Sequence, residues 1–396
     1  MSETYTLVKK EIFKYVVSNG SFTIPVIAGL TGLSTTAVSQ YVNRMKDEGI
    51  IEPMAREKSD RRGRRATLYS ISGSRFHFVG VDIKPFGLTI ALADFTGKPL
   101  LKEHLKNFTF ENTHENLDEI CNRVDSFIER SNVNRGSIAT INFNIGGRVD
   151  SGKGTSASIF NFEETQSTPL AELLSERLGT TVFIENDTKA MAYGEYSVLN
   201  RPQWKNVLFI NVGWGLGMGI ILNGDIYYGS NGYSGEFGHM PTYDNRILCH
   251  CGKKGCLETE ISGAAIVRKL TERIRNGETS RLSEKVRLGE RITTDDIINA
   301  TGNEDPLCIE LVSRAGRELG RQLAGMINIF NPDCIIIGGS MSRTAPYYFL
   351  QHASLAIRQY SLNLMSHGVA IETSKTGDDA GVIGACLIAR DRFFFR

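Results

Sequence analysis

The stretch Gly235-Glu236-Phe237-Gly238-His239, followed by Cys249-His250-Cys251-Gly252-Lys253-Lys254-Gly255-Cys256-Leu257-Glu258, decides how this chain is read. It offers one imidazole and three thiols, at His239, Cys249, Cys251 and Cys256. Zinc binds four ligands tetrahedrally, and one histidine with three thiolates is a common structural set. The two internal glycines allow the loop to double back, so that the last two thiols can reach one ion. The spacing therefore predicts a structural Zn²⁺ site with no open position for an activated water.

The composition is that of an ordinary globular protein, with 396 residues, 41% of them hydrophobic and 22% charged. This length allows two or three domains. The net charge is only +1, but residues 1–75 hold 12 basic against 7 acidic side chains, a net charge of +5, and the remainder carries −4. A basic head on an acidic body predicts that the head meets a polyanion.

The seven cysteines include four that are scattered outside the clustered three. An odd count without the spacing of a secreted disulfide framework favours a reducing compartment. The first residues contain no apolar stretch of signal-peptide length, and no run approaches the roughly 20 apolar residues of a membrane span. We therefore expect a cytoplasmic protein without a membrane segment.

Residues 1–75 are typical of a winged helix-turn-helix domain. A helical apolar rhythm over 5–17 is followed by Thr23 as a candidate cap of a second helix, and Ser34 is expected to cap a third. The inner stripe of that third helix is Ala37, Val38, Val42 and Met45. Its outer face carries polar side chains suited to base edges or phosphates in a major groove, namely Thr35, Thr36, Ser39, Gln40, Asn43 and Arg44.

A basic loop follows, between expected strands at 50–52 and 67–71. Residues 56–65 hold six cations against two anions. Such a wing can reach phosphates or a minor groove, and we predict DNA contacts from Arg61, Arg62, Arg64 and Arg65. The alternatives are a solvated charged loop and a plain three-helix packing module with a polar surface.

The body shows strand runs separated by helices. A hairpin of strands at 78–83 and 88–94, a helix at 112–132 and a strand at 138–144 are similar to an actin-like or ribonuclease-H-like lobe. A second pair of strands at 207–212 and 217–222 suggests a crude internal repeat. We expect an α/β protein with three domains: a winged helix-turn-helix at 1–75 and a two-lobed actin-like, ribonuclease-H-like ATPase fold at 76–195 and 196–379. The closing helix at 380–396 is expected to pack on the first lobe.

The pattern Glu-x-x-His followed by Cys-x-Cys-Gly-x-x-Gly-Cys-x-Glu resembles the signature of the ROK family of repressors, open reading frames and sugar kinases. Other segments resemble motifs of the same family: Ile145–Asp150, Asn161-Phe162, Phe183–Asp187, Val212–Ile220, Ile335–Ser340 and Gly381–Ala385. The resemblance covers essentially the whole chain. Regulators of this family have a winged head, a basic wing and a sugar-binding body, as this chain does.

The resemblance implies a monosaccharide pocket lined by Asn161, Asn186, Asp187, Glu236, His239 and Glu258. Carboxylates, amides and imidazoles can bond vicinal sugar hydroxyls in two-pronged fashion. His239 would then place one ring nitrogen on zinc and the other on the sugar, because a metal fixes the tautomer and the ring orientation.

In a kinase of this family, Asp187 would be the general base for the attacking hydroxyl. The family's kinases carry Asp-x-Gly-Gly-Thr and Gly-Thr-Gly-x-Gly-Gly-Gly at their phosphate loops. Here the first loop reads Asp82-Ile83-Lys84-Pro85-Phe86, and the second, Gly213–Gly219, has Trp214 for threonine and Met218 for glycine. Proline has no N–H to donate to a phosphate. The residues favour a non-enzyme in which Asp187 anchors a sugar hydroxyl.

The sequence thus predicts a sugar-responsive regulator of carbohydrate uptake or catabolism genes, acting as a repressor. We expect it to bind a double-stranded DNA operator as a homodimer or a dimer of dimers, because one head offers little contact for specific affinity. Two alternatives remain open: an ATP-dependent sugar kinase with an added head, and a regulator controlled by a protein partner.

Overall fold

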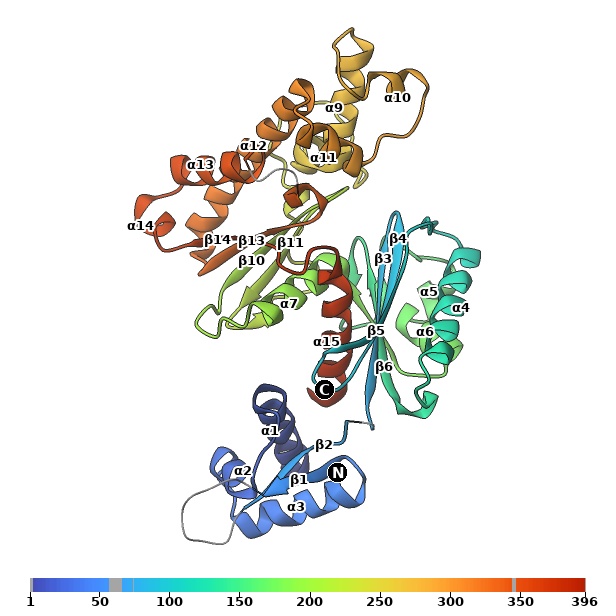
Figure 1. Ribbon diagram of the computed structural model, residues 1–396, viewed down its shortest axis with the longest axis vertical. Coiled ribbons are helices and arrows are strands. Elements are labelled where there is room, and N and C mark those ends of the chain that lie inside the picture. Colours follow the sequence, from blue (N-terminus) through green and yellow to red (C-terminus); the bar gives the residue numbers. More distant parts are fainter. Residues whose placement is uncertain (1–2, 57–65, 74, 344–346, 396) are drawn as a thin grey trace. The chain divides into compact units, whose positions relative to one another are not determined.

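The computed structural model describes residues 3–56, 66–73, 75–343 and 347–395, which form two compact units (Figure 1). Unit 1 comprises residues 1–144, 160–184 and 385–396, and unit 2 comprises 145–159 and 185–384. The residues of the predicted winged head are therefore grouped with unit 1. The boundaries at 75, 195 and 379 describe fold modules rather than contact units and stay a prediction.

The head consists of α1 (Glu3–Asn19), α2 (Ile24–Thr31), α3 (Thr35–Asp47) and an antiparallel pair, β1 (Ile51–Arg56) and β2 (Thr67–Ile71). Ser34 caps α3 as predicted, because its hydroxyl accepts a 3.2 Å hydrogen bond from the N–H of Ala37. Thr23 stands at the N-cap of α2, but its side chain makes no capping bond, so the predicted side-chain cap is wrong there. Val38, Val42 and Met45 are buried in the head's core.

The sheet of unit 1 has the order β5-β4-β3-β6-β9. Its strands are β3 (His77–Lys84), β4 (Gly87–Ala93), β5 (Pro99–Leu105), β6 (Ile138–Ile145) and β9 (Val182–Asn186). β3, β4 and β5 pair antiparallel, and β3 pairs parallel with β6. The helices are α4 (His114–Arg130), α5 (Glu164–Ser167), α6 (Leu170–Leu178) and the greater part of α15 (Ala380–Phe395). The strands and helix predicted for this lobe are confirmed.

The sheet of unit 2 repeats that arrangement in the order β12-β11-β10-β13-β14. Its strands are β10 (Val207–Val212), β11 (Leu216–Leu222), β12 (Asp225–Ile226), β13 (Cys334–Gly338) and β14 (Ala370–Thr373). Three antiparallel strands are again followed by parallel ones. The predicted internal repeat is therefore present, and the body is the expected actin-like α/β fold with two sheets.

Helices cover this second sheet, and a short ribbon, β7 (Val149–Asp150) and β8 (Thr155–Ser156), completes unit 2. The helices are α7 (Asp187–Leu199), α8 (Glu258–Ile261), α9 (Gly263–Arg275), α10 (Ser283–Arg287), α11 (Thr294–Gly302), α12 (Pro306–Phe330), α13 (Leu350–Tyr360) and α14 (Asn363–Ser366). Gly217 and Gly219 let α7 lie close on β11, since a Cβ at Gly219 would stand 2.3 Å from the Cβ of Ala192. Within the described parts of the chain, no helix is both long and apolar enough to cross a membrane.

Candidate functional site

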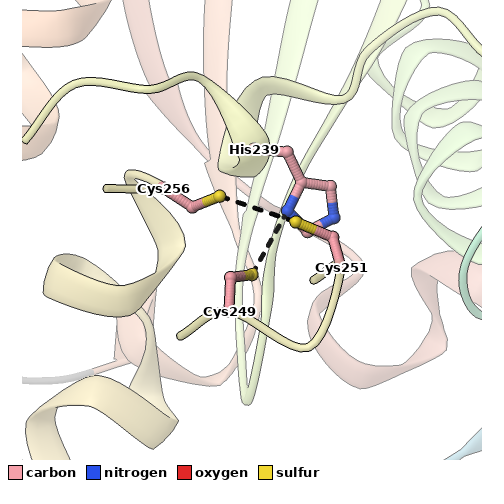
Figure 2. A group of neighbouring side chains, drawn as sticks. All are labelled: His239, Cys249, Cys251 and Cys256. Atoms are coloured by element: carbon pink, nitrogen blue, oxygen red, sulfur yellow. Dashed lines mark hydrogen bonds between the residues drawn. The ribbon is translucent and has the colours of Figure 1, made fainter. Parts of the chain in front are cut away.

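Four potential metal ligands converge on one loop of unit 2, as predicted (Figure 2). His239 ends the short helix η2 (Phe237–His239), and the three thiols lie on the segment that follows it. Gly252 and Gly255 have φ angles of 84° and 77°, a region that glycine enters without strain. A Cβ at Gly255 would stand 2.1 Å from the carbonyl oxygen of Tyr243, so the fold of this loop requires glycine there.

The spacing of the donor atoms fits one tetrahedral ion. The Sγ atoms of Cys251 and Cys256 are 3.6 Å apart, and Cys249 Sγ is 3.6 Å from His239 Nδ1 (Figure 2). With zinc–sulfur bonds of about 2.3 Å, two thiolates on a tetrahedral ion stand roughly 3.8 Å apart. All four donor atoms lie within 4.8 Å of one another. The residues present therefore fit a four-coordinate thiolate site.

A second set of four donors shares two members with the first. It replaces Cys251 and Cys256 by His250 and Glu258. His250 is largely exposed, whereas Cys249 and Cys256 are buried. Soft thiolates and imidazole are the ligands zinc prefers in structural sites. The set with three thiols is therefore the better one for zinc.

The other four cysteines have no part in this cluster. Cys121, Cys308, Cys334 and Cys386 are buried in the cores, and burial raises the pKa of each thiol to about 12. None of these four thiols joins a group of potential metal ligands among the described residues. They act as small apolar core side chains.

His239 is placed to serve two partners. Its Nδ1 faces the thiol cluster, while its Nε2 lies 3.6 Å from Oε2 of Glu236, one helical turn earlier. Gly235 and Gly238 allow this turn to lie against β11, since a Cβ at either would stand 2.0–2.2 Å from a backbone oxygen of that strand. The geometry sets the imidazole between the metal ligands and a carboxylate of the candidate sugar pocket.

Glu258 begins α8 and lies beside the thiol cluster, with its Oε1 3.8 Å from Cys249 Sγ. Its Oε2 accepts a 2.9 Å hydrogen bond from the N–H of Leu216, and its Oε1 is 2.9 Å from His250 Nδ1. Burial by itself would raise the pKa of this carboxyl, but the His250 and Leu216 bonds outweigh it and hold the pKa below its usual value. In return, the Glu258 bond raises the pKa of His250. Glu258 is therefore an ionised, firmly oriented acceptor.

Asn186 and Asp187 stand where β9 gives way to α7. The Asn186 side chain caps α7 by accepting a 3.0 Å bond from the N–H of Lys189, and donates one of 2.9 Å to the carbonyl of Gly147. Asp187 Oδ1 accepts a 2.7 Å bond from the N–H of Thr188. A Cβ at Gly146 would lie 3.9 Å from the other carboxylate oxygen. The helix start therefore presents both side chains toward the 145–148 turn.

Sequence reasoning missed Lys189, a buried cation on the same helix. Burial lowers the pKa of Lys189, and the carboxylates of Glu185, Glu236 and Asp187 oppose that shift. Glu185, also buried, accepts a 2.9 Å bond from the hydroxyl of Tyr228. A lysine in a helix pattern gives no sign of burial, so its neutralising role among these carboxylates emerges only from the fold.

Asn161 belongs to unit 1, apart from the other candidate sugar ligands by sequence and by unit. It is exposed and follows Phe160, a buried residue at the unusual φ of 52°. The N–H of Phe160 donates a 2.6 Å bond to Asn112 Oδ1, and the ring of His114 stacks on Phe162 at 3.8 Å. These contacts fix the local turn that displays Asn161, whose place in the sugar pocket stays a prediction.

The candidate DNA-binding face of α3 is largely exposed, as expected. Thr35, Thr36, Gln40 and Asn43 are exposed, and Ser39 is half-buried. Arg44 has intramolecular partners, since its Nε lies 2.9 Å from Glu48 Oε1 and its guanidinium 4.2 Å from the ring centre of Tyr5. The wing arginines Arg61, Arg62, Arg64 and Arg65 lie outside the described residues.

Comparison with known proteins decides the family. The ROK family model matches residues 78–392, and a winged helix-turn-helix DNA-binding model matches residues 7–52. The chain belongs to the ROK family. The xylose repressor of Caldicellulosiruptor bescii is 26% identical over 385 residues, 97% of this chain and 96% of that protein.

Two solved ROK structures that resemble this chain have different functions, one as a transcriptional regulator and one as a kinase. A ROK family transcriptional regulator, homologous to the Escherichia coli MLC protein, has 26% identity and a TM-score of 0.81, and covers 98% of this chain and 96% of its own. A ROK glucokinase from Streptomyces griseus, in complex with glucose and AMPPNP, has 26% identity and a TM-score of 0.67. It covers 80% of this chain and 99% of its own. Only the regulator matches the chain over its full length, head included.

The segment that matches the first phosphate loop of the family's kinases, residues 82–86, forms the turn between β3 and β4. Asp82, buried on β3, accepts a 3.0 Å bond from Asn144 Nδ2. Lys84 Nζ lies 3.4 Å from the second carboxylate oxygen of Asp82. The hairpin then closes tightly, with Lys84 opposite Gly87 and the carbonyl of Pro85 accepting from Phe110. Lys84 and Asp82 therefore form an ion pair within this segment.

The second phosphate loop, in unit 2, is pinned to the start of α9. The carbonyls of Gly213 and Trp214 accept bonds of 2.8 and 3.1 Å from the N–H groups of Gly263 and Ala264. The guanidinium of Arg291 lies 5.9 Å from the Trp214 ring centre, within cation–π range. Trp214 therefore stands in this segment where the family's kinases carry threonine, and Met218 where they carry glycine.

Proposed function

We propose that this ROK protein is a sugar-responsive transcription regulator that represses carbohydrate uptake or catabolism genes and does not phosphorylate its sugar. The observation that carries the proposal is a contrast within one body. The side chains of Glu236, His239 and Glu258 adjoin the metal loop. The segments that match the phosphate loops of the family's kinases carry Lys84, Pro85 and Trp214 where those kinases have glycine and threonine. Full-length similarity to a xylose repressor and to a ROK regulator supports it.

The pocket is chemically suited to a neutral polyol. Asp187, Glu236 and Glu258 supply carboxylate acceptors, and charge-assisted hydrogen bonds to them are stronger than neutral ones. His239 and Asn186 supply donors. Buried Lys189 lies among the carboxylates of Glu185, Glu236 and Asp187, and its charge offsets part of theirs. Asn161 is a candidate sugar ligand from the family resemblance alone.

A structural zinc ion held by His239, Cys249, Cys251 and Cys256 supports this arrangement. When bound, it fixes the imidazole tautomer that leaves Nε2 free for a sugar hydroxyl. The loop itself orients Glu258 through the N–H of Leu216, independently of the metal. The protein's four ligands fill a tetrahedral shell, so the proposed metal has a bracing role only.

The second candidate function is an ATP-dependent sugar kinase, favoured by the similarity to a glucokinase. Phosphoryl transfer depends chiefly on positioning and charge stabilisation of the phosphates. Lys84 and Trp214 stand at the two loops that would supply them. Asp187 therefore serves as a hydroxyl anchor rather than a general base in our proposal.

The proposed mechanism is a population shift. The sugar binds one arrangement of the body more tightly than another. The ratio of these two sugar affinities limits how far the sugar can change the affinity for DNA. The chain acts as a homodimer or a dimer of dimers, and the sugar-bound form holds its winged heads at a separation that misfits the operator half-sites. The protein remains in the cytoplasm, where the operator is.

The proposal is tested by combining ligand and DNA binding on the full chain. A DNA duplex is first selected from a random library by binding to the purified protein. Thermal-shift screening against pentoses, hexoses and amino sugars then identifies sugars that stabilise the protein. Each hit is titrated into the labelled duplex complex, and Asp187→Asn serves as the variant deficient in sugar binding.

We expect at least one monosaccharide to raise the midpoint of unfolding and to release the duplex from the wild type but not from the Asp187→Asn variant. A duplex complex that ignores every sugar but dissolves on addition of a sugar-transport protein would instead identify a partner-controlled regulator. Formation of sugar phosphate from ATP would replace the proposal by the kinase.

A further inference from the structure

A buried carboxylate outside the sugar pocket has an unusual set of partners. Glu195 lies on α7, fully buried, and accepts hydrogen bonds from the segment that precedes α15. The N–H groups of Lys375 and Thr376 donate to it at 3.1 and 2.9 Å, and the hydroxyls of Ser374 and Thr376 donate as well. Four donors on one carboxylate satisfy it without any cation, so a single side chain ties α7 to residues 374–376.

Backbone packing reinforces that tie. A Cβ at Gly194 would stand 2.4 Å from the carbonyl oxygen of Ala380, and one at Gly384 would stand 1.8 Å from the carbonyl of Ala190. The first turn of α15 therefore lies directly on α7, with no side chain between the two backbones. Packed elements in such contact move together or exchange discrete arrangements, because interiors are close-packed.

The two halves of α7 carry residues of two different groups. Its N-terminus carries Asn186 and Asp187, which belong to the proposed sugar pocket. Glu195 stands eight residues farther along the same helix, a little over two turns. A helix of this length is rigid, so a shift imposed on Asp187 by a sugar is delivered to Glu195 and to the 374–376 segment.

α15 begins among the residues of unit 2 and continues among those of unit 1. Residues 380–384 lie in unit 2, and the remainder lies in unit 1 with the head. Near its C-terminus, the buried Phe394 stacks on Phe13 of α1, with ring centres 3.9 Å apart and planes inclined by 28°. Phe393 and Phe394 also meet Phe76 and Phe78, which anchors this end of the helix at the base of the head.

The last step leads to the DNA-binding helix. The hydroxyl of Tyr5 on α1 donates a 2.6 Å bond to Glu48, which caps α3. Arg44 joins the same group through its ion pair with Glu48. Burial, followed by the Glu48 bond, raises the pKa of Tyr5 to about 12, so the donor proton stays in place at physiological pH. These contacts join α1 to the C-terminal end of α3.

We infer that Glu195 is a positioning residue that couples the sugar pocket to the DNA-binding head through α15. This inference rests on the proposed function, because it names the route by which that pocket regulates DNA binding. Glu195 touches neither sugar nor DNA in this account. Its role is to make the start of α15 follow α7.

The first test needs no sugar. Amide hydrogen exchange is compared between the full-length wild type and Glu195→Gln, which keeps the shape but sets an amide N–H₂ against a donating N–H. We expect exchange to accelerate by about tenfold in residues 374–384, because a charge-assisted bond is lost there. The same variant should accelerate exchange in α1 of the head, which a merely local role would leave unchanged. Glu172→Gln, an exposed carboxylate on α6, is the matched control.

The second test uses D-glucose, D-xylose and N-acetyl-D-glucosamine as probes. For Glu195→Gln, we expect sugar Kd and sugar-free DNA Kd within about twofold of wild type, while the sugar-induced change in DNA Kd disappears. Thr376→Val, which removes one hydroxyl donor and keeps the N–H, should weaken the coupling partly. The double variant should add little to Glu195→Gln, because the two changes break one shared contact.

The inference would be overturned if amide exchange in α1 of the Glu195→Gln variant were as slow as in the wild type. It would also be overturned if the sugar-induced change in DNA Kd of that variant were undiminished. Should Glu195→Gln fail to fold, Thr376→Val decides by the same two measurements. If none of the three sugars binds the wild type, the proposed function fails for those sugars, while the exchange comparison still decides whether Glu195 links α7 to the head.

Discussion

Replacement of Glu258 by glutamine separates the chemistry of the sugar pocket from its architecture. In the wild type, the N–H of Leu216 donates a 2.9 Å hydrogen bond to Glu258 Oε2. The side-chain oxygen of glutamine can accept the same bond, and the NH₂ group of the glutamine can face His250. The shape of the loop is therefore preserved. The change removes the negative charge that makes Glu258 a strong acceptor for a sugar hydroxyl.

The expected magnitudes follow from the contacts. A hydrogen bond to a charged group contributes about 1.5–3 kcal/mol and a neutral one about 0.5–1.5 kcal/mol, so the sugar should lose about 1–1.5 kcal/mol. That corresponds to a roughly five- to thirteenfold rise in sugar Kd. Stability should change by less than about 1 kcal/mol, because the buried N–H of Leu216 keeps an acceptor. Glu258→Ala leaves that N–H unpaired and should cost about 1–3 kcal/mol of folding stability in addition.

Isothermal titration calorimetry with the monosaccharide that the wild type binds best, a urea unfolding curve and a zinc determination on each variant measure these quantities. Glu272→Gln, an exposed carboxylate paired with Arg268 on α9, is the control and should bind sugar as the wild type does. An unchanged sugar Kd in Glu258→Gln, with its metal retained, would refute the assignment of Glu258 to the pocket.

Three further predictions concern the head, the metal loop and the core. Changing Arg62, Arg64 and Arg65 together to Ala should reduce the slope of log K against log salt for DNA by about 2.7, which a salt titration measures; an unchanged slope would remove the wing from the interface. Cys256→Ser should release zinc and abolish the sugar response, and full metal content by mass spectrometry would contradict this. Asp305, buried at the N-cap of α12 with three donors, should destabilise the fold by about 3 kcal/mol when changed to Ala in urea unfolding. Burial would raise the pKa of Asp305, but the three hydrogen bonds outweigh it and lower the pKa. The stability that Asp305 contributes is therefore present above about pH 3.8 and is lost as the pH falls through its pKa in the folded state. A folding stability that did not change on acidification would disprove this role.

Features with a local cause were predictable from the sequence. The metal loop follows from ligand spacing and two glycines, and the strands follow from continuous apolar runs that both sheets bury. The Ser34 cap was predicted from a residue type with one local function. Thr23 was the exception, since its backbone rather than its side chain begins α2. In each case the interacting groups are near one another along the chain.

Features with a distant cause were not predictable. The burial of Lys189 leaves no pattern in the sequence, because the groups around it come together only in the fold. Glu195 receives its donors from residues about 180 positions away. Arg44 is exposed on the outer face of α3 as predicted, but its contact with the ring of Tyr5 on α1 comes from the fold. Charged residues in a helix pattern read as solvent-facing, and only the tertiary structure shows which of them are buried.

The central claim is that this ROK protein reads a sugar without altering it. Its most direct test is a single titration of a binding monosaccharide into the protein–duplex complex in the presence of magnesium and ATP. Fluorescence anisotropy follows the DNA while mass spectrometry follows the sugar. We predict release of the duplex with the sugar recovered unmodified and the ATP intact; stoichiometric or catalytic conversion to a sugar phosphate would contradict the account.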